Sequence, residues 1–148
     1  MKNKKLFLEK EYTKIFNNLG YKPDDVFGYW YTLNGEDWDL VDKEGFNLKD
    51  EIYDIGRDFG IIALLKEQVC DWLRTEHYMY VEVYKHFDRM DFSVRIEMGN
   101  FKKIEVNGFF DDYYVAQEEG IKECLKRIKI KLYEIFFRHR IFRRNSRK

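Results

Sequence analysis

The feature that most constrains the fold is a strict alternation of apolar and polar residues in the middle of the chain. Apolar side chains occupy every second position of residues 79–83 and 92–98, on either side of a polar stretch at 88–91. Because successive side chains of a strand point to opposite faces, both segments predict half-buried strands joined by a turn. With a third strand expected at residues 103–109, the pattern predicts a small antiparallel sheet.

Helical patterns flank this expected sheet on both sides. Apolar residues recur with a period near 3.6 over residues 61–77 and again over residues 116–136. Asp111 or Asp112 is suited to cap the start of the second helix. The order helix, three-stranded antiparallel sheet, helix over residues 61–136 predicts an α+β core in which both helices cover one face.

The first 60 residues predict an added N-terminal lobe. Residues 6–19 have helical spacing that ends at Gly20, and residues 48–59 repeat that spacing. Between them, two β-prone segments flank Asn34-Gly35, a strong signal for a hairpin turn. We expect a single domain of residues 1–148, comprising a helix and acidic hairpin (1–60), the core (61–136) and a basic tail (137–148). Whether the hairpin joins the core sheet or forms a separate lobe stays open.

Composition excludes several classes of protein. Aromatic residues make up 18% of the chain, against nine glycines and one proline, which excludes a disordered chain. No apolar run is long enough for a signal peptide or a membrane-spanning helix. The two cysteines are too few for a disulfide framework. We therefore expect a protein of the cytoplasm of a bacterial host, with no membrane partner.

The charges are separated along the chain, although 27 basic residues balance 27 acidic ones. Residues 22–60 carry 11 acids and four bases, whereas residues 121–148 carry 11 bases and two acids. The acidic hairpin is either a solvated edge that resists aggregation or a patch that docks on a basic partner. The residues of that acidic patch are Glu36, Asp37, Trp38, Asp39, Asp42 and Glu44.

The basic C-terminal segment interleaves arginine with aromatic residues, a mixture suited to phosphate contacts and to stacking on unpaired bases. Bases near a helix C-terminus also interact favourably with the negative end of the helix dipole. The alternative to a binding role is therefore that these bases are solvated or are neutralised by acids of the same molecule. The candidate residues for protein or nucleic-acid binding are Lys126, Arg127, Arg138, Arg140, Phe142, Arg143, Arg144 and Arg147.

Motifs for catalysis are not found in the sequence. The three histidines, His77, His86 and His139, lack the spacing of a zinc site, and no phosphate-binding loop or nucleophile motif occurs. His77 is expected at a helix end, in a capping role. Asp111 and Asp112 are expected to cap a helix rather than hold a cation. We expect no enzyme activity, no metal and no cofactor.

One family resemblance bears on the origin of the chain. The segment Val69-Cys70-Asp71-Trp72-Leu73-Arg74-Thr75-Glu76-His77, the following strands and residues 109–125 resemble small uncharacterised proteins encoded by phages and prophages. Thr75 replaces a usual lysine, and Tyr114-Val115 replaces glutamates. The resemblance covers residues 61 to about 130 and implies no activity. It implies a tryptophan and leucine facing the core, and an alanine and a glycine where helix meets sheet.

Three functional hypotheses follow. The first is a phage or mobile-element accessory protein that binds a host protein or ribonucleoprotein, such as an anti-defence inhibitor of a CRISPR effector. The second is an RNA-binding or single-strand-binding module that acts through the basic C-terminal segment. The third is an enzyme, which requires Asp111, Asp112, His77 or His86 to converge in one pocket. The sequence does not determine the oligomeric state.

Overall fold

The structure, a computed structural model, describes residues 4–32, 36–42 and 60–145, apart from the side chains of Asp42 and of residues 135–145. The chain divides into two compact units, Met1–Trp72 and Leu73–Lys148. The division falls inside one helix rather than near residue 60. Helices and antiparallel sheets occur together, which confirms the expected α+β class.

The N-terminal unit contains a three-stranded antiparallel sheet of order β2-β1-β3. Its strands are β1 (Gly28–Tyr31), β2 (Asp39–Asp42) and β3 (Gly60–Ile62). The predicted hairpin is confirmed by the pairing of β1 with β2, although its turn at 33–35 lies outside the described residues. The hairpin thus belongs to a sheet of its own and does not extend the sheet formed later in the chain.

The core of this unit forms where the short first helix, α1 (Lys10–Asn18), and the sheet supply large apolar side chains. Phe7, Trp30, Leu40 and Ala63 make one buried cluster. The Trp30 indole N–H donates a hydrogen bond to the Leu8 carbonyl at 3.2 Å, which satisfies its one polar atom. Trp30 and Tyr31 of the hairpin are therefore core residues.

Two helix starts predicted from the sequence are wrong. The first helix was expected from residue 6, but a 3-10 turn (η1, Lys4–Leu6) and an extended Phe7 precede α1. A second helix was expected from residue 61, but residues 60–62 form β3. The helix α3 (Lys66–His77) begins later. Short apolar runs suit strand and helix equally, and pairing of Ile61 with Trp30 decides for the strand. The helix expected at 48–59 lies outside the described residues.

The C-terminal unit contains the sheet predicted by alternation. Strands β4 (Met79–His86), β5 (Asp91–Met98) and β6 (Lys103–Phe110) pair antiparallel in chain order. The apolar face carries buried Val94 and Ile96 of the central strand, whereas Tyr80, Glu82 and Lys103 of the other face are exposed. The sheet is thus covered on one face, as its period-two pattern requires.

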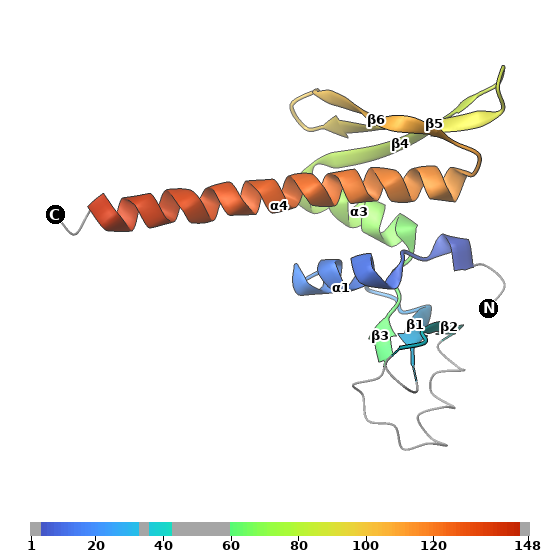
Figure 1. Cartoon of the computed structure of the whole chain (residues 1–148), viewed down its shortest axis with the longest axis horizontal. Helices are drawn as coiled ribbons and strands as arrows, with labels where there is room; N and C mark the ends of the chain where they lie inside the picture. The colour runs from blue at the N-terminus through green and yellow to red at the C-terminus, as the bar shows by residue number, and fades with distance from the viewer. Residues whose placement is uncertain (1–3, 33–35, 43–59, 146–148) are drawn as a thin grey trace. The chain divides into compact units, whose positions relative to one another are not determined.

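The helix α4 (Tyr113–Asn145) covers the apolar face and contacts all three strands (Figure 1). A Cβ on Gly120 would lie 2.5 Å from a methyl of Val81 and 2.8 Å from a methyl of Val94, so only glycine allows this approach. Ala116 is also fully buried there. Gly120 thus stands where the helix comes close to β4 and β5.

The start of α4 has the expected cap, whereas its end differs from the prediction. The Asp112 carboxylate accepts hydrogen bonds from the backbone N–H groups of Tyr114 and Val115, at 2.8 and 3.3 Å. The helix then continues to Asn145, so residues 137–145 are helical rather than a tail. At 33 residues α4 is about 50 Å long, and its second half runs on past the sheet (Figure 1).

Candidate functional site

The acidic patch expected on the hairpin is tied into the N-terminal unit. The Trp38 ring packs against the buried cluster and has the ammonium groups of Lys10 and Lys14 at 4.7 and 5.2 Å from its centre. Glu36, Asp37 and Asp39 are exposed, whereas the Asp42 side chain and Glu44 lie outside the described residues. Trp38 is therefore a structural residue with cations near its ring, and the docking role expected for the acids around it stays a prediction.

The predicted basic residues divide into two groups along α4. Lys126 and Arg127 both form ion pairs with Glu123, at 3.7 and 3.2 Å, and Lys122 pairs with Glu118 and Glu119 one turn earlier. These (i, i+3) and (i, i+4) pairs are of the kind that support a helix. In the first half of α4, bases are matched by acids of the same helix.

The second half of α4 has few such partners. Residues 129–144 contain six bases and one acid, Glu134. The backbone of this stretch includes five of the predicted residues, Arg138, Arg140, Phe142, Arg143 and Arg144. The predicted residue Arg147 lies outside the described residues. Over these 16 residues the helix is about 24 Å long. We call residues 129–144 the distal half of α4.

Apolar side chains are exposed on the first turn of the distal half. Ile130 is 54% exposed, Leu132 39% and Tyr133 71%. By contrast Ile121, Leu125 and Ile128, earlier on the same helix, are buried. An apolar surface rimmed by like charges is typical of a site that binds another macromolecule.

A pocket lies at the junction between the two halves of the helix. It has a volume of about 490 Å³, and its walls come from the end of α3, the ends of β4 and β5, and α4. Its lining residues are Glu76, His77, Met79, Met98, Arg127, Ile128, Ile130, Lys131, Leu132 and Glu134. Sequence reasoning missed this pocket, because its residues come from three separate segments.

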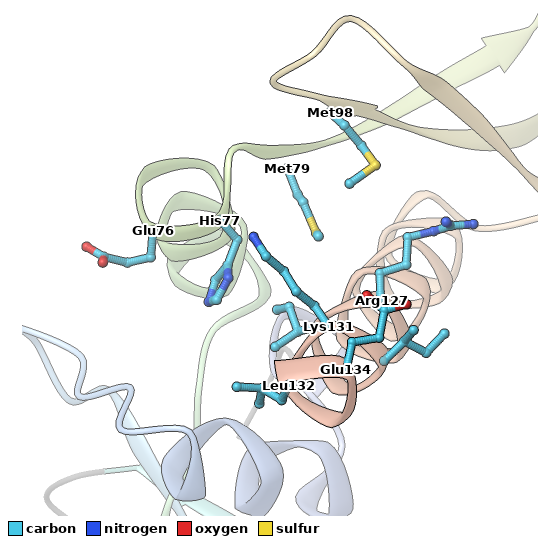
Figure 2. A pocket seen from close by; sticks show the side chains of 10 residues that line it. Glu76, His77, Met79, Met98, Arg127, Lys131, Leu132 and Glu134 are labelled. Atoms are coloured by element: carbon cyan, nitrogen blue, oxygen red, sulfur yellow. The ribbon is translucent and has the colours of Figure 1, made fainter. Parts of the chain in front are cut away.

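The interior of the pocket is apolar and one of its walls is cationic. Met79 and Ile128 are almost fully buried, and the two methionine side chains stand together above α4. Figure 2 shows the Lys131 side chain reaching from α4 toward His77 and Met79. Since thioether side chains adapt to many shapes, this interior suits an apolar group of variable form.

The surroundings of the His77 side chain, at the end of α3, favour the neutral form of its imidazole. Partial burial lowers the pKa of this imidazole below its ordinary value of 6.5, the charge of Lys131 lowers it further, and Glu76 opposes the shift. We expected an imidazolium in a capping role at this helix end. The helix does end at His77, but its surroundings disfavour the charged form.

The open face of the β4-β5-β6 sheet carries a polar network that the sequence analysis did not single out. Arg95 donates two hydrogen bonds to the Glu82 carboxylate, at 2.7 and 3.0 Å, and the Tyr84 hydroxyl donates one to Glu105 at 2.8 Å. The hydrogen bond from Arg95 lowers the pKa of Glu82, and the bond to Glu105 raises that of Tyr84. These groups satisfy one another across strands, so they act in folding.

One end of this sheet presents exposed apolar side chains around the β4–β5 turn. Phe87, Met90 and Phe109 are all more than half exposed, and the Arg89 guanidinium lies 4.0 Å from the centre of the Phe109 ring. Met90 has φ of 60°, a left-handed conformation that costs a non-glycine residue energy. The charges around this tip are mixed in sign, so they favour no particular partner.

The residues suggested for catalysis do not come together. His77 and His86 stand at opposite ends of β4, His86 is hydrogen-bonded to Ser93 at 2.7 Å, and Asp112 caps α4. Within the described ranges no group of three or more metal-ligating side chains occurs. The same residues contain no helix that is both long and apolar enough to cross a membrane.

Comparisons with known proteins found no match to this chain. The chain matches no protein-family model, no curated protein and no solved structure. The functional argument therefore depends on the site itself.

Proposed function

We propose that this chain is a non-enzymatic binding protein that contacts an acidic host protein through the distal half of α4. The observation that carries the proposal is the difference in charge between the two halves of α4. In the first half the bases form ion pairs with acids of the same helix, whereas the distal half contains six bases and one acid. An excess of charge of one sign raises the rate and specificity of association with an opposite surface.

The apolar side chains beside these bases favour a protein over a nucleic acid. Ile130 and Leu132 are aliphatic, and they have no planar face on which a base stacks. In protein interfaces an apolar centre surrounded by charges is the usual arrangement. The resemblance to phage-encoded proteins supports a narrower form of the proposal, in which the chain occludes a host defence machine such as a CRISPR effector.

The alternative is RNA or single-stranded nucleic acid. Tyr133 is the observation that supports it, because this ring is 71% exposed next to the bases of the distal half. Such binding would weaken steeply with salt, since each phosphate contact releases counterions.

The test compares two charge-reversal variants of the full chain. One carries Lys129→Glu, Arg138→Glu and Arg140→Glu; the control carries the same change of charge at exposed Lys22, Lys102 and Lys103. Each tagged protein is used to isolate partners from nuclease-treated host lysate. We expect wild type and control to retain an acidic protein in stoichiometric amount, and the distal variant to lose it.

Two results would contradict the proposal. Equal retention of the partner by the distal variant would place the binding surface elsewhere. Loss of all bound material on nuclease treatment, with tight binding to single-stranded RNA, would replace the acidic protein by nucleic acid.

A further inference from the structure

The pocket and the distal half of α4 form one continuous surface. Ile130, Lys131 and Leu132 line the pocket and also belong to the distal half. A partner that contacts the first turn of the distal half therefore lies at the pocket. A concave apolar site inside a charged surface is where binding energy is usually concentrated.

We propose that the pocket receives an apolar anchor, a phenylalanine or leucine side chain, from an acidic segment of the partner protein. This inference rests on the proposed function and names the chemistry of the partner at that same site. The anchor enters between Met79, Met98 and Leu132, and the carboxylates that flank it contact the bases along α4.

The dimensions and interior of the pocket fit such an anchor. Its volume of about 490 Å³ lies within the range of roughly 300–1,000 Å³ found for binding pockets. Ile128 forms a wall that is only 3% exposed, whereas Leu132 is 39% exposed. A side chain that enters there therefore covers apolar surface that now faces water, which is the main source of favourable free energy in such contacts.

Two bases and two acids line the pocket, so the preference for an acidic segment comes from the excess of bases along residues 129–144. Lys131 reaches across the pocket, and no ion pair to this ammonium occurs among the residues that the structure describes. The Nε of Arg127 is buried and lacks a hydrogen-bond partner within the described residues, and the guanidinium pairs with Glu123. Glu76 and Glu134 repel carboxylates from two positions of the lining and so restrict where the acidic residues lie.

The experiment uses the full chain and two labelled peptides of twelve residues. Both consist of aspartate and glutamate; one has phenylalanine and leucine at two central positions, and the other has alanine there. Fluorescence anisotropy gives both affinities. Because burial of one large apolar side chain stabilises by about 1.5–3 kcal/mol, we expect the anchored peptide to bind at least about tenfold more tightly.

Two variants place that difference in the pocket. Leu132→Asp puts a carboxylate at its edge and is expected to remove the advantage of the anchored peptide. Val115→Asp makes the same kind of change at a site of similar exposure near the start of α4, and it should leave the advantage within about twofold. Circular dichroism melting of both variants shows whether each is folded.

The outcomes separate this inference from the proposed function. Equal affinity of wild type for the two peptides, or an unchanged advantage in Leu132→Asp, would overturn the anchor. If the charge-reversed distal variant then fails to bind either peptide, the proposed function stands without the apolar anchor. Failure of wild type to bind either peptide, with tight binding of a twelve-nucleotide polyuridine, would overturn both.

Discussion

The two halves of α4 have the same helical period of apolar residues but opposite surroundings. In the first half Ile121, Leu125 and Ile128 are buried, and the bases have acidic partners one turn away. In the distal half Ile130 and Leu132 are exposed, and bases greatly outnumber acids. The first half of the helix thus belongs to the fold, whereas the distal half carries the excess of bases on which the proposed binding role rests.

The largest difference between the halves is expected on truncation of an apolar side chain. Ile121→Ala should lower the free energy of unfolding of the C-terminal unit by about 2–5 kcal/mol, because this side chain is fully buried. Leu132→Ala in the distal half should cost less than about 1 kcal/mol. Urea unfolding followed by circular dichroism measures both values, and equal costs would contradict the division.

A smaller effect is expected from a methyl group added where helix and sheet are closest. Gly120→Ala should destabilise the C-terminal unit by about 1–3 kcal/mol, because the new Cβ would lie 2.5 Å from a methyl of Val81. Elsewhere in a helix this change usually stabilises. Tryptophan fluorescence provides the control, since all three tryptophans belong to the N-terminal unit and should report no change. A stabilised variant would mean that helix and sheet are further apart.

The helix cap should contribute less again. Asp112→Ala removes the acceptor of two backbone N–H groups at the start of α4, at an expected cost of about 0.5–2 kcal/mol. Asp112→Asn retains a capping oxygen and should recover most of the lost stability in the same unfolding measurement. If alanine and asparagine behave alike, Asp112 does not cap the helix.

The smallest effect is expected from the titration of His77. Its folded-state pKa lies below 6.5, because of burial and the charge of Lys131, with Glu76 acting against the shift. As pH falls through 6.5 toward the folded-state pKa, the unfolded chain binds this proton more readily, so stability is lost in that window. Lys131→Gln should reduce the loss and His77→Gln should remove it. An unchanged pH profile in His77→Gln would show that this group does not contribute.

The sequence predicted the elements that depend on local pattern. Period-two alternation predicted β4 and β5, and the order of element types predicted the α+β class. It failed at residues 60–65, where a few apolar residues fit either helix or strand and only pairing with β1 decides between them. The basic end of α4 was predicted as a tail of residues 137–148, yet the backbone stays helical to Asn145.

The candidate site could be predicted only in part. Charge counting found the bases of the distal half, but it did not show that Lys126 and Arg127 pair with Glu123. The acidic patch around Trp38 was proposed without knowing that Lys10 and Lys14 lie over its ring. Pairs that are distant in sequence depend on packing, which composition and spacing do not report.

The most direct test of the account measures folding and binding in the same variant. The triple substitution Lys129→Glu, Arg138→Glu and Arg140→Glu changes only the distal half of α4. The account predicts a melting temperature within about 3 °C of wild type together with loss of the acidic partner protein. A variant that melts much earlier and still retains its partner would show that these bases serve the fold and not binding.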